Sequence, residues 1–343
     1  MGNPRETAVL TLAACERQGA WSDGHLKRAI RERGLDRRDG ALATRLCYGV
    51  LQNKLLLDWR LGRVCSMKLD KLDIRILCDL RVAAYQLLFL DKIPASAAVN
   101  EAVELAKRHS RNPRAAGLVN GVLRALLREE APEIRGRDEI ETLSLRYSHP
   151  RWLVEEFAGQ LGLEGTEAFL QANNEQPPTT VQVNTMSTTA ERLGEELQEA
   201  GAEVEPHPWL PNCLLLTGTG DLERLDAFQR GDFYVQDAAS RMAVMAADPK
   251  PGQRVLDCCA APGGKSFAAA IAMGNRGELI SCDIHPHKIK LLEAGRDRLG
   301  LSMVAPTLQN AAQTREDWLE GFDVVLTDVP CSGLGIIRKK PDI

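Results

Sequence analysis

The first part of the chain carries apolar side chains at the spacing of helices. They recur every three or four residues in ALATRLCYGVLQNKLLLDWRL and in IRILCDLRVAAYQLLFL, which places them on one face of a helix. Breaks in this pattern fall at Gly34, Pro94 and Pro113, residue types that end or interrupt helices. We therefore predict an all-α domain over residues 1–130.

The middle of the chain changes its pattern twice. Residues 131–176 keep helical spacing, for example in LSLRYSHPRWLVEEFAGQLGL, and His149-Pro150 interrupts it. We predict a helical connector here. In residues 177–240, TTVQVNT alternates like a strand, ERLGEELQEAGAEVEP is a helix with a stop at Gly201, and NCLLLTG and FYVQD are strand-like. These segments predict a small α+β domain.

The last part, residues 241–343, alternates strands and helices. The predicted strands are RVLDCC, GELISCDI, MVAPTLQN and FDVVLTDV, and helical segments separate the first three. Alternating β and α elements indicate a parallel sheet with right-handed crossovers, the doubly wound arrangement. Because only four strands can be counted, we predict an incomplete α/β Rossmann-like domain.

Composition narrows the class of protein. Of the 343 residues, 44% are hydrophobic and 26% are charged, and no apolar run approaches the roughly 20 residues that span a bilayer. The N-terminal stretch has polar residues inside its apolar part and does not resemble a signal peptide. The nine cysteines form no CxxC pair, which argues against disulfides and zinc sites. We expect a cytoplasmic monomer without a membrane anchor or a metal.

The charge is unevenly distributed. Residues 1–128 carry 23 Lys and Arg against 13 Asp and Glu, a charge of +10, whereas the remainder carries 20 against 34, a charge of −14. A basic domain suits a polyanion such as nucleic acid, because phosphate contacts release counterions. A solvated helical surface explains the same charge, and this pattern alone leaves both interpretations open.

A glycine turn follows the first strand of the α/β domain in DCCAAPGGKS. It matches neither G-x-G-x-x-G nor a Walker loop, which needs a glycine where this chain has Cys259. Asp283 closes the next strand, about 20 residues further on, where an acidic side chain can accept both hydroxyls of a ribose. This combination indicates an adenosine-bearing cofactor, although Asp283 also suits an N-cap of the following helix.

The fourth strand ends in DVPCSG, which places Asp328 and Cys331 at the ligand edge of the sheet. Most cysteines outside any context are small buried apolar residues. Cys331 instead follows a proline after a polar strand end and precedes the flexible Ser332–Gly335 loop, so it is a candidate reactive thiol.

Two segments together resemble the signature motifs of the RNA cytosine-5 methyltransferases. They are VLDCCAAPGGK at 255–265 and LTDVPCSGLGIIRKKP at 326–341. The helical segment resembles the NusB-type RNA-binding domain of the 16S ribosomal RNA branch of this family (RsmB/Sun type), and YSHPRWLVEEF is similar to its connector. The resemblance implies S-adenosylmethionine as cofactor, 16S ribosomal RNA as partner and methylation of carbon 5 of a cytosine.

The resemblance also implies roles for residues. The cofactor loop would consist of Cys259, Ala260, Ala261, Pro262, Gly263, Gly264 and Lys265. Asp283 would meet the ribose, Asp328 would lie beside the cofactor and the target base, and Cys331 would assist release of the methylated product. Candidate RNA contacts are Arg111, Arg114, Arg338, Lys339 and Lys340, although the last three suit a solvated surface equally well.

The chain departs from the family pattern in two places. The family's covalent thiol belongs to a later Thr-Cys-Ser motif, and no Thr-Cys dipeptide occurs in the 343 residues. Asn310 and Ala311 stand where relatives usually place an acidic residue against the adenine. We therefore expect retained RNA affinity, weak or absent cofactor binding and no turnover by this chain alone.

Two rival functions remain. One is a non-catalytic RNA-binding or assembly protein in which a methyltransferase remnant only docks. The other is a nucleotide-dependent dehydrogenase, which the AAPGGK loop and the Pro-Cys element disfavour. His285 and His287 have no further ligands nearby in sequence, so we assign them to the surface rather than to a metal.

Overall fold

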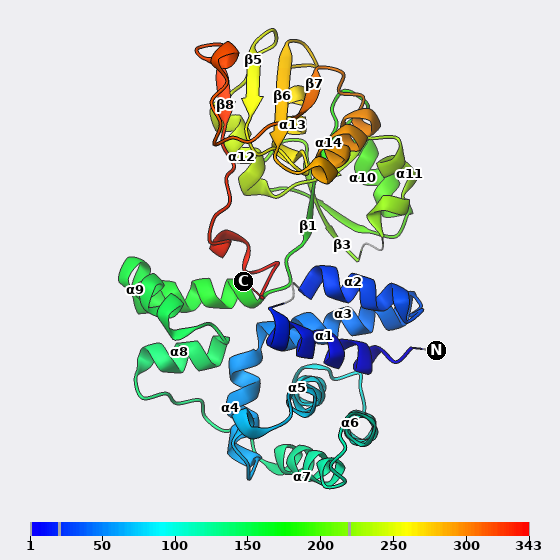
Figure 1. The fold of residues 1–343 in the computed structure, drawn as a ribbon, viewed down its shortest axis with the longest axis vertical. Coiled ribbons are helices and arrows are strands. Elements are labelled where there is room, and N and C mark those ends of the chain that lie inside the picture. Colours follow the sequence, from blue (N-terminus) through cyan, green and yellow to red (C-terminus); the bar gives the residue numbers. More distant parts are fainter. Residues whose placement is uncertain (1, 20–21, 219–220, 343) are drawn as a thin grey trace. The chain divides into compact units, whose positions relative to one another are not determined.

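The computed structural model describes residues 2–19, 22–218 and 221–342 (Figure 1). The chain divides into two compact units. The first consists of Met1–Gln176 together with Gly333–Ile343, and the second consists of Pro177–Ser332. We describe each unit by itself.

The first unit begins with a helical bundle. Its α-helices are α1 (Pro4–Gln18), α2 (Ser22–Glu32), α3 (Arg37–Gln52), α4 (Lys54–Val64), α5 (Ile74–Phe89), α6 (Ala95–His109) and α7 (Ala115–Arg128). α5 lies at the centre, because every residue from Ile76 to Gln86 is buried and it packs against α1, α3, α4, α6 and α7. The predicted all-α domain is confirmed.

Polar side chains set where several of these helices begin. Asn3 accepts the backbone N–H groups of Arg5 and Glu6 at the start of α1. Asp36 accepts the N–H of Asp39 at the start of α3. Such caps pair N–H groups that have no partner within the helix.

Two further helices complete the first unit. They are α8 (Glu139–Tyr147) and α9 (Arg151–Asn174), which pack through Leu143, Val154 and Leu170. α9 is two helices joined at Gly162, whose φ of 69° lies in the left-handed region that favours glycine. No helix among the described residues is long and apolar enough to cross a membrane.

The second unit contains an antiparallel sheet of four strands. The strands are β1 (Thr179–Val183), β2 (Glu203–Pro206), β3 (Cys213–Thr217) and β4 (Phe233–Val235), in the order β2-β3-β1-β4. α10 (Ala190–Glu199) and α11 (Asp226–Gln229) contribute to a core around Phe233. The α+β prediction is confirmed, but it lacked β2. The helical segment was predicted to run to Pro206, but α10 ends at Glu199 and EVEP forms this mostly exposed edge strand.

The second sheet of this unit is parallel. Its strands are β5 (Arg254–Asp257), β6 (Glu278–Asp283), β7 (Val304–Leu308) and β8 (Val324–Leu326), in the order β7-β6-β5-β8. The helices are α12 (Ala238–Ala247), α13 (Gly264–Ala272) and α14 (Pro286–Leu299). The register pairs Asp257 with Leu326, so the segments after β5 and β8 begin side by side. This part is Rossmann-like, as predicted.

Hydrogen bonds join the two sheets within this unit. Asn184 donates its Nδ2 to the carbonyl oxygens of Gly231 (2.9 Å) and Leu299 (3.1 Å). Arg298 donates to the carbonyl oxygens of Phe228 (2.7 Å) and Phe233 (3.0 Å), and its guanidinium lies 3.8 Å from the ring centroid of Phe228. We call these contacts the Asn184–Arg298 joint. They fix the α+β sheet to the end of α14.

Candidate functional site

The loop after β5 is held between its two neighbouring strands. The N–H of Cys258 donates to the carbonyl of Leu326 at the end of β8 (2.9 Å), and the N–H of Ala260 donates to the carbonyl of Cys282 in β6 (2.7 Å). The first bond extends the pairing of β5 with β8 by one residue, and the second ties the loop to β6 three residues beyond the end of β5. The loop is therefore fixed at the carboxyl edge, where doubly wound sheets bind their ligands.

The glycines of this loop are required by close packing. Gly263 has a φ of +117°, and a β-carbon there would lie 2.2 Å from the ring of Phe267. A β-carbon on Gly264 would lie 3.3 Å from Nε2 of Gln236, a buried residue whose two amide atoms have no hydrogen-bond partner. α13 has no side-chain cap, so its first N–H groups remain available to a ligand.

Asp257 ends β5 and is completely buried. Its Oδ2 accepts the hydroxyl of Ser266 (2.8 Å), and the hydroxyls of Ser266 and Ser281 lie 2.7 Å apart. Its Oδ1 has no hydrogen-bond partner of normal geometry, although the nearby N–H of Cys259 favours the ionised carboxylate and by itself would lower the pKa of Asp257. Burial outweighs these bonds and raises the pKa of Asp257 to about 6.

Two residues that are 63 positions apart meet at the edge of the sheet. Lys265, in the first turn of α13, donates to Oδ2 of Asp328 at 2.6 Å, and its Nζ lies 3.4 Å from the hydroxyl of Ser240. The Lys265 side chain is 18% exposed, whereas that of Asp328 is 57% exposed. Lys265 is thus largely buried, and the Asp328 carboxylate that it holds faces solvent.

Asp283 is the last residue of β6 and is 6% exposed. Its Oδ1 accepts the N–H of His285 (3.0 Å), and Lys288 lies 3.5 Å from its Oδ2. His285 is the N-cap of α14 and has no capping side-chain bond of its own. Asp283 therefore holds the residue that caps α14 but is not itself the N-cap that the alternative interpretation expected, and its second oxygen is only weakly engaged.

The cysteines of the site differ in exposure. Cys331 is exposed and lies in a segment without helix or strand. Cys258 and Cys259 are half-buried, and burial raises the pKa of both thiols. Cys282 is buried in β6, and burial raises its pKa to about 12. Of these four cysteines, Cys331 is the most exposed.

The remaining predicted residues lie elsewhere. Asn310 follows β7 and accepts the N–H of Ala312 with its side chain (3.0 Å), so it closes a turn. Arg111 and Arg114 are exposed in the connection between α6 and α7. In the first unit, Arg338 donates to the carbonyl of Glu175 (3.2 Å). The other two candidates, Lys339 and Lys340, follow it in the chain.

His285 and His287 are both exposed, in keeping with their assignment to the surface. Within the part of the chain that the structure describes, no three His, Cys, Asp or Glu residues are grouped to hold a metal ion.

Asp257 and its two serines were missed as functional candidates. The acidic end of a buried strand was a visible signal, but the bonds depend on Ser266 and Ser281 from two other elements. Gln236 gave no signal, since its position against Gly264 follows from the packing of α12 and α13.

A parallel sheet with a glycine loop after one strand and acidic side chains at neighbouring strand ends defines a Rossmann-like fold with a ligand edge, and the family models place it among the methyltransferases. Three family models match the chain: the NusB family at residues 2–128, the RsmF/B-like ferredoxin-like domain at 149–223, and the 16S rRNA methyltransferase RsmB/F at 244–343.

Relatives with the same organisation cover most of the chain. The probable ribosomal RNA small subunit methyltransferase B of Bacillus subtilis is 38% identical over 342 residues, which are 99% of this chain and 76% of that protein. The ribosomal RNA small subunit methyltransferase B of Klebsiella pneumoniae is 33% identical over 89% of this chain and 69% of its own length. The chain therefore belongs to the 16S ribosomal RNA methyltransferase RsmB/F family.

Solved structures agree with this assignment. The crystal structure of PH0851 matches all of this chain and 77% of its own, with a TM-score of 0.77 and 26% identity. A methyltransferase homologue from Pyrococcus horikoshii matches 60% of this chain and 67% of its own, with a TM-score of 0.52 and 27% identity.

Proposed function

We propose that this chain provides the RNA-binding and cofactor-binding parts of an S-adenosylmethionine-dependent enzyme that methylates carbon 5 of a cytosine in 16S ribosomal RNA. The observation that carries the proposal is the pair of Lys265 and Asp328 at 2.6 Å. It brings the glycine loop and the Asp-Val-Pro-Cys segment, the two signature motifs, to one edge of the sheet. The names of the relatives supply the ribosomal RNA substrate.

The residues at this edge fit the cofactor. Gly263 and Gly264 let the loop pack closely on Phe267 and Gln236, and the uncapped start of α13 offers N–H groups to a carboxylate. The second oxygen of Asp283 is the acceptor proposed for the ribose hydroxyls. When bound, S-adenosylmethionine supplies a methyl group on a positively charged sulfur.

The chemistry assigns different tasks to two thiols. Carbon 5 of cytosine is a weak nucleophile, so a thiolate first adds to carbon 6, and carbon 5 then takes the methyl group. A base removes the proton from carbon 5, and the thiolate leaves carbon 6 to restore the ring. We assign Cys331 to this release step, close to the carboxylate that Lys265 holds at Asp328.

The 343 residues contain no Thr-Cys dipeptide for the attacking thiol. We therefore propose that this chain alone binds RNA and does not turn over. Asn310, which closes a turn instead of offering a carboxylate to the adenine, should further weaken cofactor binding.

Three measurements with the purified chain test the proposal. Filter binding should show affinity for unmodified 16S ribosomal RNA, and crosslinking of labelled S-adenosylmethionine should be competed by S-adenosylhomocysteine but not by a nicotinamide nucleotide. Incubation with tritiated S-adenosylmethionine and this RNA should give no incorporation. Incorporation that Cys331→Ala abolishes would make Cys331 the attacking thiol and overturn its assignment to release.

A further inference from the structure

The segment that follows Cys331 belongs to the helical unit. Residues 333–342 group with the first unit, whereas Cys331 and Ser332 group with the second. We call residues 333–342 the tether. In Figure 1 the tether is the red end of the chain beside the end of α9 and the start of α2, two elements of the first unit.

A small groove of the helical unit holds the apolar side chains of the tether. Leu334, Ile337 and Pro341 of the tether are half-buried in it. The opposite wall consists of Leu51, Pro150, Trp152 and Leu153. The space left in the groove is about 60 Å³, roughly the volume of two water molecules. Burial of these apolar groups therefore stabilises the docked tether.

Two polar side chains fasten the tether to the same unit. Arg338 donates its Nε to the carbonyl oxygen of Glu175 (3.2 Å) and its Nη2 to that of Gln176 (3.5 Å). Oδ2 of Asp342 accepts the N–H of Ser22, the first residue of α2, at 3.0 Å. A carboxylate at the start of a helix is also stabilised by the helix dipole.

Arg338 also joins the two places where the chain passes between the units. The first passage is at residues 176–177 and the second is at residues 332–333. Gln176 is the last residue before the first passage, and Arg338 follows the second. Their hydrogen bond thus keeps the two segments of chain together inside the first unit.

The loop that carries Cys331 is held at both ends. At its start, Asp328 accepts a hydrogen bond from Lys265 at 2.6 Å, and at its end Leu334 enters the groove. Five residues, 329–333, separate these two anchors. Fixing both ends of so short a segment restricts the conformations that it can adopt. The docked tether therefore limits the positions that the thiol can occupy.

We propose that the helical unit positions the thiol of Cys331 through the tether, with Arg338 and Asp342 as positioning residues. Both act through the loop rather than on the cofactor or the base. The inference rests on the proposed function, in which Cys331 assists the release step. It gives the helical unit a part in that step besides the binding of RNA.

The test follows a nitroxide label on Cys331, which is exposed, whereas the other eight cysteines are buried or half-buried. Asp342→Ala removes a hydrogen bond to a charged group, so the tether should leave the groove about ten times more often. The spectrum of the label should shift toward the mobile form. Hydrogen exchange should speed up by the same factor at the amides of Ile336 and Lys340, which donate within the docked tether.

Two matched variants separate positioning from a general loss of stability. Asp342→Asn keeps an oxygen that accepts the N–H of Ser22, and it should restore a spectrum close to that of the parent. Asp73→Ala removes a carboxylate that accepts the N–H of Arg75 at the start of α5 (2.8 Å), in the same unit but away from the tether. The label should not respond to Asp73→Ala, and circular dichroism checks that every variant is folded.

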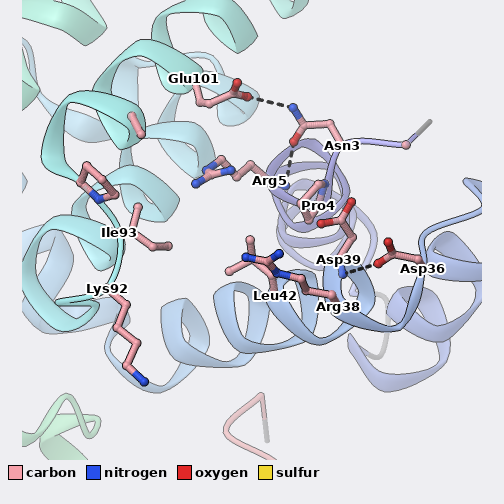
Figure 2. Close-up of a pocket in the computed structure, with 13 residues that line it drawn as sticks. Asn3, Pro4, Arg5, Asp36, Arg38, Asp39, Leu42, Lys92, Ile93 and Glu101 are labelled. Carbon is pink, nitrogen blue, oxygen red and sulfur yellow. Dashed lines mark hydrogen bonds between the residues drawn. The ribbon is translucent and has the colours of Figure 1, made fainter.

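Arg338→Ala should mobilise the label in the same way, and Arg38→Ala is its control. Arg38 lines a cavity of about 770 Å³ together with Arg5 and Lys92, between the first turn of α1, the first turns of α3 and the connection from α5 to α6 (Figure 2). No residue of the tether is among those that line this cavity. The label should therefore be unaffected by Arg38→Ala.

Equal spectra for Asp342→Ala and Asp73→Ala, or a mobile label in Asp342→Asn, would overturn the proposal. The outcomes also separate it from the proposed function. If the unmodified chain binds no 16S ribosomal RNA, the proposed function fails, and the part of the tether in the release step fails with it. If the chain binds this RNA but the label ignores Asp342→Ala and Arg338→Ala, the inference alone fails.

Discussion

Asp257→Asn should stabilise the second unit, although it removes a charge from the edge where the cofactor is proposed to bind. The carboxyl group is completely buried, and its pKa rises from 3.8 to about 6. A raised pKa means that folding disfavours the ionised form. The free-energy cost of burying the ionised carboxylate is absent below about pH 4, grows as the pH rises toward 6 and is constant above about pH 6. At 1.36 kcal/mol per pKa unit it amounts to about 3 kcal/mol as an upper bound.

Asparagine keeps an oxygen that can accept the hydroxyl of Ser266 and cannot ionise. The variant should therefore be more stable than the parent at pH 7.5, by about 2 to 3 kcal/mol, and equal to it near pH 4. Hydrogen exchange of amides in β5 and β6 reports the opening free energy of this unit without a contribution from the helical bundle. Asp323→Asn, at an exposed carboxyl that accepts the N–H of Arg254, is the matched control and should show no gain.

A loss of stability in Asp257→Asn that is larger at pH 7.5 than at pH 4 would refute this reasoning. The charge of Asp257 would then stabilise the fold instead of opposing it. A gain confined to neutral pH would show that the site retains a charge at the expense of stability, as functional sites commonly do.

Three further substitutions test the packing inside each unit, one in the second unit and two in the first. Gly231→Ala should lower the free energy of unfolding in urea by about 3 kcal/mol, because a β-carbon there would lie 2.0 Å from the carbonyl oxygen of Arg298. The control Gly201→Ala, also at positive φ but in open space, should lower it by about 1 kcal/mol. Asp79→Asn should stabilise the helical unit at pH 8, by about 5 kcal/mol as an upper bound at 1.36 kcal/mol per pKa unit, and not at pH 4, since burial raises the pKa of Asp79 to about 8. Equal effects at both pH values in thermal melts would contradict this. Arg81→Lys should destabilise the helical unit by about 2 kcal/mol, because lysine cannot make the paired bonds of 2.7 Å to Asp58; an unchanged melting temperature would contradict this.

Features that depend on local pattern could be predicted from the sequence. The helical spacing of apolar residues predicted the bundle of α1 to α7, since most of these helices bury one face and expose the other, while α5 is buried all round. The parallel sheet and the position of Asp283 at a strand end followed from alternating strands and helices. The order β7-β6-β5-β8 then brings Asp328 next to the glycine loop.

Features that depend on several elements at once could not be predicted. β2 is an exposed edge strand, and its residues EVEP were included in the helical segment because they bury no apolar face that would mark a strand. The burial of Asp257 involves a hydroxyl from α13 and another from β6. The cavity of the bundle combines Arg5, Arg38 and Lys92, which lie on three segments far apart in the chain. No spacing along the sequence predicts that residues from such distant segments lie close together.

The Asn184–Arg298 joint limits how this protein can be recombined with its relatives. Asn184 and Arg298 donate to backbone carbonyls, whose positions follow from the path of the chain more than from side-chain identity. A chimera that exchanges the α+β sheet alone keeps the joint if the donor has an asparagine at the position of 184 and a glycine at that of 231. Without them, the grafted sheet would lose its fixed angle to the methyltransferase sheet, even where each part folds correctly.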